Sequence, residues 1–118
     1  MKVISVVKLL GTTALLSAEK GLELLDNMMQ ALLNTNQLTI DFCGYECISS
    51  TFLNRSFGRL CVEMKWDLNE IKEKLELLNL NEDDREDLEL AVLNAIERSE
   101  LLKNGVDLNS HYSSIYTY

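Results

Sequence analysis

The stretch IDFCGYECISSTFLNRSFGRL, residues 40–60, contains the change from strand to helix that decides the fold. Apolar and polar residues alternate from Leu38 to Phe42, which is the period of a strand, and Gly44 interrupts the pattern. Three hydroxyl residues in a row, Ser49, Ser50 and Thr51, then precede a helical period. Its apolar residues recur at three- and four-residue steps and predict an amphipathic helix over about 52–65: Leu53, Phe57, Leu60, Cys61 and Met64.

Strands and helices also alternate on both sides of this stretch. Before it, the sequence predicts a strand over 2–7, a turn at Gly11, a short strand over 13–16 and a helix over 18–33 capped by Ser17. After it come a helical turn opened by a capping-box pattern over 67–70, a strand over 74–80, and a helix from an Asn81 cap to about Lys103.

This order predicts an α/β fold, with a small mixed, mostly parallel sheet of about four strands and helices packed on it. Because parallel strands are joined by right-handed crossovers, residues 44–51 should lie at the carboxyl end of a central strand, where α/β sheets carry functional groups. We expect one domain over 1–104 and a C-terminal tail over 105–118. The tail contains the apolar and aromatic residues Tyr112, Ile115, Tyr116 and Tyr118.

Charge and composition exclude several classes of protein. A net charge of −8 and eleven basic residues scattered along the chain argue against a nucleic-acid groove. No apolar run approaches the roughly 20 residues that span a bilayer, so we expect a cytoplasmic protein without membrane contact. Cys43, Cys47 and Cys61 are odd in number and lack metal-site spacing. We therefore predict no metal and no cofactor, and expect these cysteines to be small buried residues in a reducing compartment.

The three hydroxyl residues allow two interpretations. One hydroxyl can cap the following helix by accepting an orphan N–H, but capping explains one residue and not three. The alternative is capping together with a regulated or partner-facing surface. Asp41 fits a surface carboxylate, a metal ligand or an anchor for loop N–H groups, and we favour the anchor. A catalytic triad is not expected, because the single histidine, His111, lies in the tail.

Residues 39–60 resemble the signature of STAS-like domains, small bacterial relatives of the anti-sigma-factor antagonists. The residues that match the marked positions of that pattern are Asp41, Phe42, Gly44, Ile48, Ser49, Ser50, Phe52, Phe57 and Gly58. The resemblance covers most of residues 2–100, is strongest over 38–60, and implies a STAS-like arrangement of sheet and helices.

The resemblance implies a non-catalytic regulatory module that binds another protein. The antagonists bind an anti-sigma factor with a GHKL-type kinase fold and lose it when a hydroxyl at this turn is phosphorylated. They carry Asp-Ser-Ser-Gly there, so Thr51 matches the phosphorylated serine, Ser50 the serine before it, and Ser49 the aspartate. All three hydroxyls are therefore phosphoacceptor candidates. Leu53, Asn54 and Arg55 depart from the pattern, which usually places a small residue and two acids at these positions.

The implied partner is a GHKL-type ATPase or a serine/threonine kinase. It would contact the turn and helix start over 44–55 through Asp41, Gly44, Ser49, Ser50, Thr51, Asn54 and Arg55. The alternative is a constitutive assembly or antidote subunit that holds its partner through the same turn and the aromatic tail without phosphorylation. A third hypothesis, an enzyme using Asp41 or a thiol, ranks last, and the sequence leaves a homodimer open.

Overall fold

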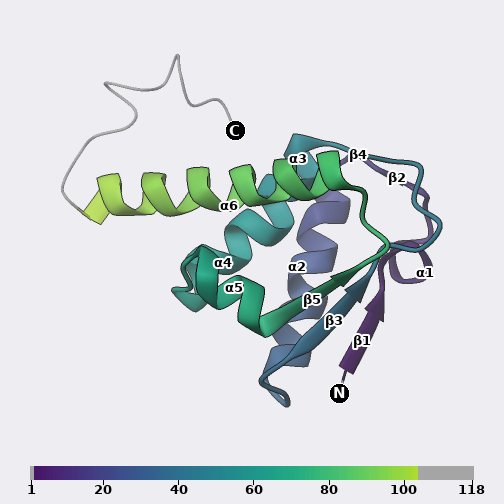
Figure 1. The fold of residues 1–118 in the computed structure, drawn as a ribbon, viewed down its shortest axis with the longest axis horizontal. Coiled ribbons are helices and arrows are strands. Elements are labelled where there is room, and N and C mark those ends of the chain that lie inside the picture. The colour runs from purple at the N-terminus through teal and green to yellow at the C-terminus, as the bar shows by residue number, and fades with distance from the viewer. Residues whose placement is uncertain (1, 104–118) are drawn as a thin grey trace.

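The computed structural model describes residues 2–103 as parallel strands covered by helices (Figure 1). In chain order its elements are β1 (Lys2–Ser5), α1 (Val6–Leu10), β2 (Ala14–Leu15), α2 (Ala18–Leu32), β3 (Leu38–Asp41), β4 (Cys47–Ile48), α3 (Ser50–Leu53), the π-helix η1 (Asn54–Gly58), α4 (Arg59–Met64), α5 (Leu68–Lys74), β5 (Leu75–Leu78) and α6 (Glu82–Lys103). The predicted tail, including its tyrosines and His111, lies outside the described residues, so the boundary at 104 stays a prediction.

The main sheet has three parallel strands in the order β1-β3-β5. Ile40 of the central strand pairs with Ile4 on one side and with Leu77 on the other. A separate parallel pair is formed by β2 and β4. The predicted α/β fold is confirmed, and the strands divide as three plus two instead of forming one sheet of about four. β4 was not predicted, because its two residues lie between the break at Gly44 and the hydroxyl run and, unlike those of β2, belong to no apolar run.

The first predicted strand is too long by two residues. The chain turns into α1 at Val6, although Val6 and Val7 favour strands by propensity. Val6 and Leu10, four residues apart, are both buried on one face of this helix, so packing overrides the local preference. Gly11 ends the helix in the left-handed region, with φ of 67°, and donates its N–H to the carbonyl of Val7.

The helix predicted over 52–65 is continuous from Ser50 to Met64 but contains a π turn. η1 holds one residue more per turn than an α-helix, and the N–H of Arg59 accordingly reaches the carbonyl of Asn54, five residues back. The predicted apolar stripe is confirmed: Leu53, Phe57, Leu60 and Cys61 are buried, and Met64 is partly buried against the core. Lys65, with φ of 59°, ends the helix.

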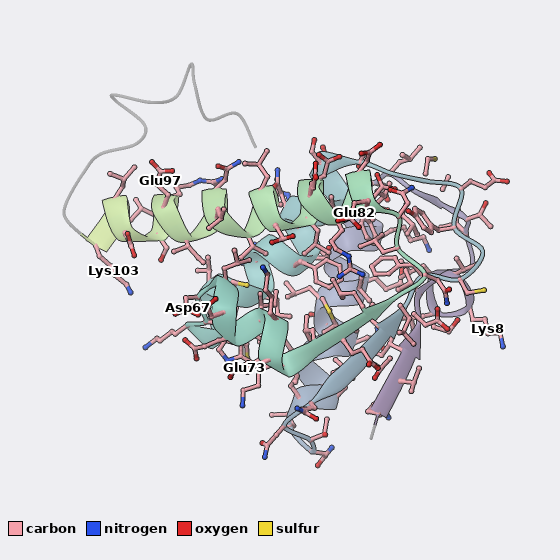
Figure 2. The ribbon with its side chains drawn as sticks, in the orientation of Figure 1. Lys8, Asp67, Glu73, Glu82, Glu97 and Lys103 are labelled. Carbon is pink, nitrogen blue, oxygen red and sulfur yellow. The ribbon has the colours of Figure 1, made fainter. Side chains whose placement is uncertain are left out.

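Three predicted helix caps are confirmed. Ser17 accepts the N–H of Lys20, Asp67 and Glu70 form a reciprocal capping box, and the Asn81 side chain accepts the N–H of Asp84. The strand predicted over 74–80 is present as β5. Helices α2 and α6 therefore begin where their caps predict, and α6 reaches Lys103 as expected (Figure 2).

The helix over residues 50–64 is packed tightly against two other helices through glycines. A Cβ added at Gly21 of α2 would lie 2.9 Å from the carbonyl oxygen of Phe52 and 2.9 Å from Cβ of Arg55. A Cβ added at Gly58 would lie 3.2 Å from the carbonyl oxygen of Ala91 in α6. The absence of a side chain at these positions allows the backbones to approach this closely.

No helix within residues 2–103 is both long enough and apolar enough to cross a membrane.

Candidate functional site

The candidate site is the loop and helix start that follow the central strand β3, residues 41–55. As predicted, this segment leaves the carboxyl end of the central strand of the sheet. Phe42 and Tyr45 form a tight turn in which the N–H of Tyr45 bonds the carbonyl of Phe42 at 3.0 Å. Gly44 occupies the third position of that turn with φ of 91°, which favours glycine there.

Asp41 anchors the start of this loop. Its Oδ1 accepts the N–H of Cys43 at 3.0 Å and the side-chain amide of Asn79 at 2.8 Å. These donors, Asn79 first, lower the pKa of Asp41 from its ordinary value, because both stabilise the charged carboxylate. The anchoring role predicted for Asp41 is confirmed, and Asn79 is a partner that the sequence did not identify.

Tyr45 ties the middle of the loop to α6. Its hydroxyl donates to Oδ2 of Asp84 at 2.6 Å and accepts the N–H of Asn81 at 3.1 Å, while its ring packs edge-on against Phe42. Burial and the neighbouring carboxylate of Asp84 raise the pKa of Tyr45. Sequence reasoning missed this residue, because Tyr45 and Asp84 are far apart in the chain.

The end of the loop is held by β2 and by the residues on either side of it. The N–H groups of Glu46 and Ser49 donate to the carbonyls of Thr13 and Leu15 at 2.8 and 2.9 Å. The Ser49 hydroxyl donates to the carbonyl of Leu16 at 2.8 Å and accepts the N–H of Phe52 at 3.1 Å. Ser49 is therefore the helix cap predicted from the sequence, and its hydroxyl acts both as a donor and as an acceptor.

The other two hydroxyl residues are presented to solvent. Ser50 and Thr51 are exposed on the first turn of the helix, where backbone N–H groups have no partner within the helix. The next residue, Phe52, is fully buried and fixes this turn against the core. The structure thus brings the predicted hydroxyls together at an exposed edge, with one engaged in capping and two accessible.

The remaining two predicted contact residues, Asn54 and Arg55, lie beside a cavity and not at the exposed turn. Asn54 and Arg55, both half-buried, line a cavity of about 270 Å³ together with Arg59 and Arg98. The basic residues that are scattered in the sequence are therefore partly gathered in space. Arg55 and Arg59, four residues apart in a helix, gave a sequence signal for this grouping, but nothing in the sequence brought Arg98 beside them.

The expectation of buried cysteines is wrong for two of the three. Cys43 and Cys47, which flank the Gly44 turn, are exposed, whereas Cys61 is buried. They are exposed because the short turn and β4 lie at the surface and only Phe42 of the turn enters the core. Burial, reinforced by Asp67 and Glu70, raises the pKa of Cys61 to about 12, which keeps its thiol protonated.

The described residues were also considered as metal ligands. Within residues 2–103 no group of three or more His, Cys, Asp and Glu side chains is placed to hold a metal ion. Asp41 is the residue that the sequence suggested as a metal ligand, and its Oδ1 accepts the two hydrogen bonds described above.

Comparison with known proteins gives one match. The family model described as a STAS-like domain of unknown function (DUF4325) matches residues 20–85, which is more than half of the chain and includes the whole candidate site. Neither the curated proteins nor the solved structures gave a match.

Proposed function

The chain belongs to the STAS-like domain family, and from that premise we propose that it is a non-catalytic, regulatory protein-interaction module. The proposed docking surface is the segment over 44–55 together with Asp41. The proposed partner is a GHKL-type ATPase or a serine/threonine kinase, the class implied by the resemblance to anti-sigma-factor antagonists. The three free thiols fit a reducing cytoplasm, where we place the protein.

One observation carries the proposal: Ser50 and Thr51 are exposed on a first helical turn that is rigidly held on both sides. Ser49 bonds Leu16 and Phe52, and the side chain of Phe52 is buried. A partner would therefore meet two hydroxyls on a preformed surface and would not have to order a flexible loop, which lowers the entropic cost of binding.

Phosphorylation of this turn would provide a switch. A phosphate on Ser50 or Thr51 would lie near the unpaired N–H groups and the positive end of the helix, so the domain could carry it without unfolding. The same group adds a charge of about −2, which would repel or desolvate a partner docked on the turn. Ser49 is the weakest of the three candidates, because a phosphate there would break both bonds made by its hydroxyl.

The experiment uses the GHKL-type ATPase encoded nearest to this chain. Incubation with that protein and ATP, followed by mass spectrometry, should place added phosphate on Ser50 or Thr51. Thr51→Glu and the double variant Ser50→Ala, Thr51→Ala should then separate the effect of charge from that of the hydroxyls on affinity. Thr35→Ala, which alters a hydroxyl before β3, is the control that should leave binding unchanged.

The constitutive assembly or antidote subunit is the second candidate. It is favoured by the rigid attachment of the loop through Asp41, Tyr45 and Ser49, which makes the surface complete without modification. In that case the double alanine variant should bind the partner as tightly as the unaltered chain, and no phosphate should be added. Loss of binding in Thr51→Glu alone would show that the surface is correct but unmodified.

A further inference from the structure

The outer edge of β1 has no neighbouring strand within residues 2–103. The strand order β1-β3-β5 gives β1 a single partner, and β1 lies at the border of the sheet in Figure 1. Along such an edge, the backbone groups of alternate residues point away from the sheet and can pair with another extended chain. At the opposite edge, the Arg85 side chain donates to the carbonyl of Leu77 in β5 at 3.2 Å, so that edge is partly closed.

A groove of about 800 Å³ adjoins this edge. All four residues of β1 line it, together with residues of α1, of the carboxyl half of α2 and of the segment that follows α2. Leu9 and Ala31 form the apolar part of its lining, and Asn27, Gln30 and Asn34 contribute amide groups. Peptides that add a strand to a sheet need this combination, because the open edge bonds the main chain of the peptide and the groove accepts its alternate side chains.

The groove is basic although the chain is acidic. Lys2 and Lys8, both exposed, line the groove and no carboxylate does, whereas the whole chain has 19 acidic residues and a net charge of −8. Neither lysine belongs to an ion pair within residues 2–103. Two lysines at one edge attract an anionic segment and repel a second copy of the same edge. Residues 104–118 of this chain contain a single acid, Asp107, and so match the groove poorly.

The alternation of side chains along β1 determines what each side of an added strand would meet. Successive side chains of a strand point to opposite faces of the sheet. Ile4 is buried in the core beneath the helices, so Lys2 lies on the helix-covered face, and Val3, which is 57% exposed, lies on the other face. Lys8 is also on the helix side, because α1 packs against α2. An added strand would therefore meet both lysines on one face and an apolar side chain on the other.

We propose that the edge of β1 binds an acidic, extended peptide segment of another protein as an added strand. Glutamates at alternate positions of the peptide would lay their methylene groups over the apolar part of the groove and place their carboxylates near Lys2 and Lys8. Apolar residues at the intervening positions would cover Val3, and the main chain would pair with β1. This site shares no residue with the docking surface proposed over 41–55, so the two proposals stand or fall separately.

The first test is calorimetric titration of the full chain with the peptide acetyl-Glu-Val-Glu-Val-Glu-amide. The same peptide with lysine in place of glutamate, and a capped peptide with the sequence of residues 106–112, are titrated in parallel. The acidic peptide should bind at least tenfold more tightly than either. The proposal is overturned by comparable binding of the lysine peptide, by tighter binding of the 106–112 peptide, or by no heat from the acidic peptide at about 1 mM.

Backbone methylation of the peptide tests whether it binds as a strand. One peptide carries N-methyl groups on its valines and another carries them on its glutamates. Because only alternate N–H groups of a strand face one neighbour, one of these two peptides should lose at least tenfold in affinity while the other keeps it. Equal affinities of the two methylated peptides would exclude strand addition.

Lysine variants locate the site. The double variant Lys2→Gln, Lys8→Gln should weaken binding of the acidic peptide at least fivefold. The double variant Lys65→Gln, Lys103→Gln changes the net charge equally beside another cavity, between α4 and α6, and should leave binding unaltered. An equal loss in both variants would reduce the effect to net charge and refute the assignment. Sedimentation of the unaltered chain should show a monomer, and a dimer that the Lys2, Lys8 variant alters would assign the edge to a second copy instead.

Discussion

The hydroxyl of Tyr45 lies 2.6 Å from Oδ2 of Asp84, and this hydrogen bond joins the loop after the central strand to the first turn of α6. The hydroxyl oxygen of Tyr45 also accepts the N–H of Asn81, so the side chain of Tyr45 both satisfies an N–H at the start of the helix and fixes the loop. Residues 39 positions apart in the chain are thereby held in one local structure.

Replacement of Tyr45 by phenylalanine should destabilise the domain. Hydrogen bonds to charged groups contribute about 1.5–3 kcal/mol, so Tyr45→Phe should lower the free energy of unfolding by roughly 2 kcal/mol in urea denaturation at pH 7. Because the folded-state pKa of Tyr45 is raised above the unfolded value of 10.0, its contribution is complete below pH 10 and is lost as the pH rises through the folded pKa. A stability equal to that of the unaltered chain at pH 7 would contradict this role.

Ser49 and Ser50 should respond differently to the same substitution. Ser49→Ala removes both the helix cap and the bond to Leu16, and should cost about 1–2 kcal/mol of stability. Ser50→Ala removes an exposed hydroxyl and should stay within about 0.5 kcal/mol. Thermal and urea unfolding of the two variants provide the comparison, and equal losses would mean that the cap lies elsewhere.

Substitution of Gly21 and of Gly44 should destabilise the domain for different reasons. Alanine at Gly21 meets backbone at 2.9 Å and should cost about 1–3 kcal/mol by overpacking. Alanine at Gly44 meets nothing within 4 Å, and its cost of about 1 kcal/mol comes only from the φ of 91°. Asparagine should therefore be milder than alanine at Gly44 and worse at Gly21, as measured by urea unfolding. The same ranking at both positions would refute one of the two causes.

The stability of the domain in acid should depend on Asp41. Its folded-state pKa is lowered by Asn79 and Cys43, so its stabilising contribution is complete above the unfolded pKa of 3.8 and is lost as the pH falls through the folded value. The variant Asp41→Asn should show a smaller loss of stability between pH 5 and pH 2. Glu73→Gln, an exposed acid outside the loop, is the matched control, and equal curves for both variants would argue against the anchor.

Local patterns in the sequence were sufficient for most of the fold. The period of residues 52–65 and the caps at Ser17, Asp67 and Asn81 gave the helices, because their signals lie within one or two turns. The strand predicted for Val6 and Val7 was wrong, because burial of α1 against the rest of the chain outweighed their strand propensity. The pairing of β4 with β2 requires a contact between residues that no local period encodes.

In the candidate site, too, the sequence identified the residues with local roles and missed those whose partners are distant in the chain. Asp41, Gly44 and the hydroxyl run were identified because their roles depend on neighbours within a few residues. Asn79 and Asp84 were missed since they reach the loop from another part of the chain. The arginine cavity was missed for the same reason: a count of charges along a sequence does not say which of them the fold will collect.

The π turn makes the helix over 50–64 sensitive to length. Each residue of an α-helix advances the chain by about 100°, so the extra residue held between Asn54 and Gly58 sets the angular phase of everything after it. Deleting one residue there would tighten the turn into a regular helix with its far end still in register with the core. Deleting one residue in the regular helix beyond the π turn, such as Val62, would instead rotate Met64 by about 100° away from the core that it packs against. The π turn is therefore the place in this helix where losing one residue would disturb the angular phase of the buried face least.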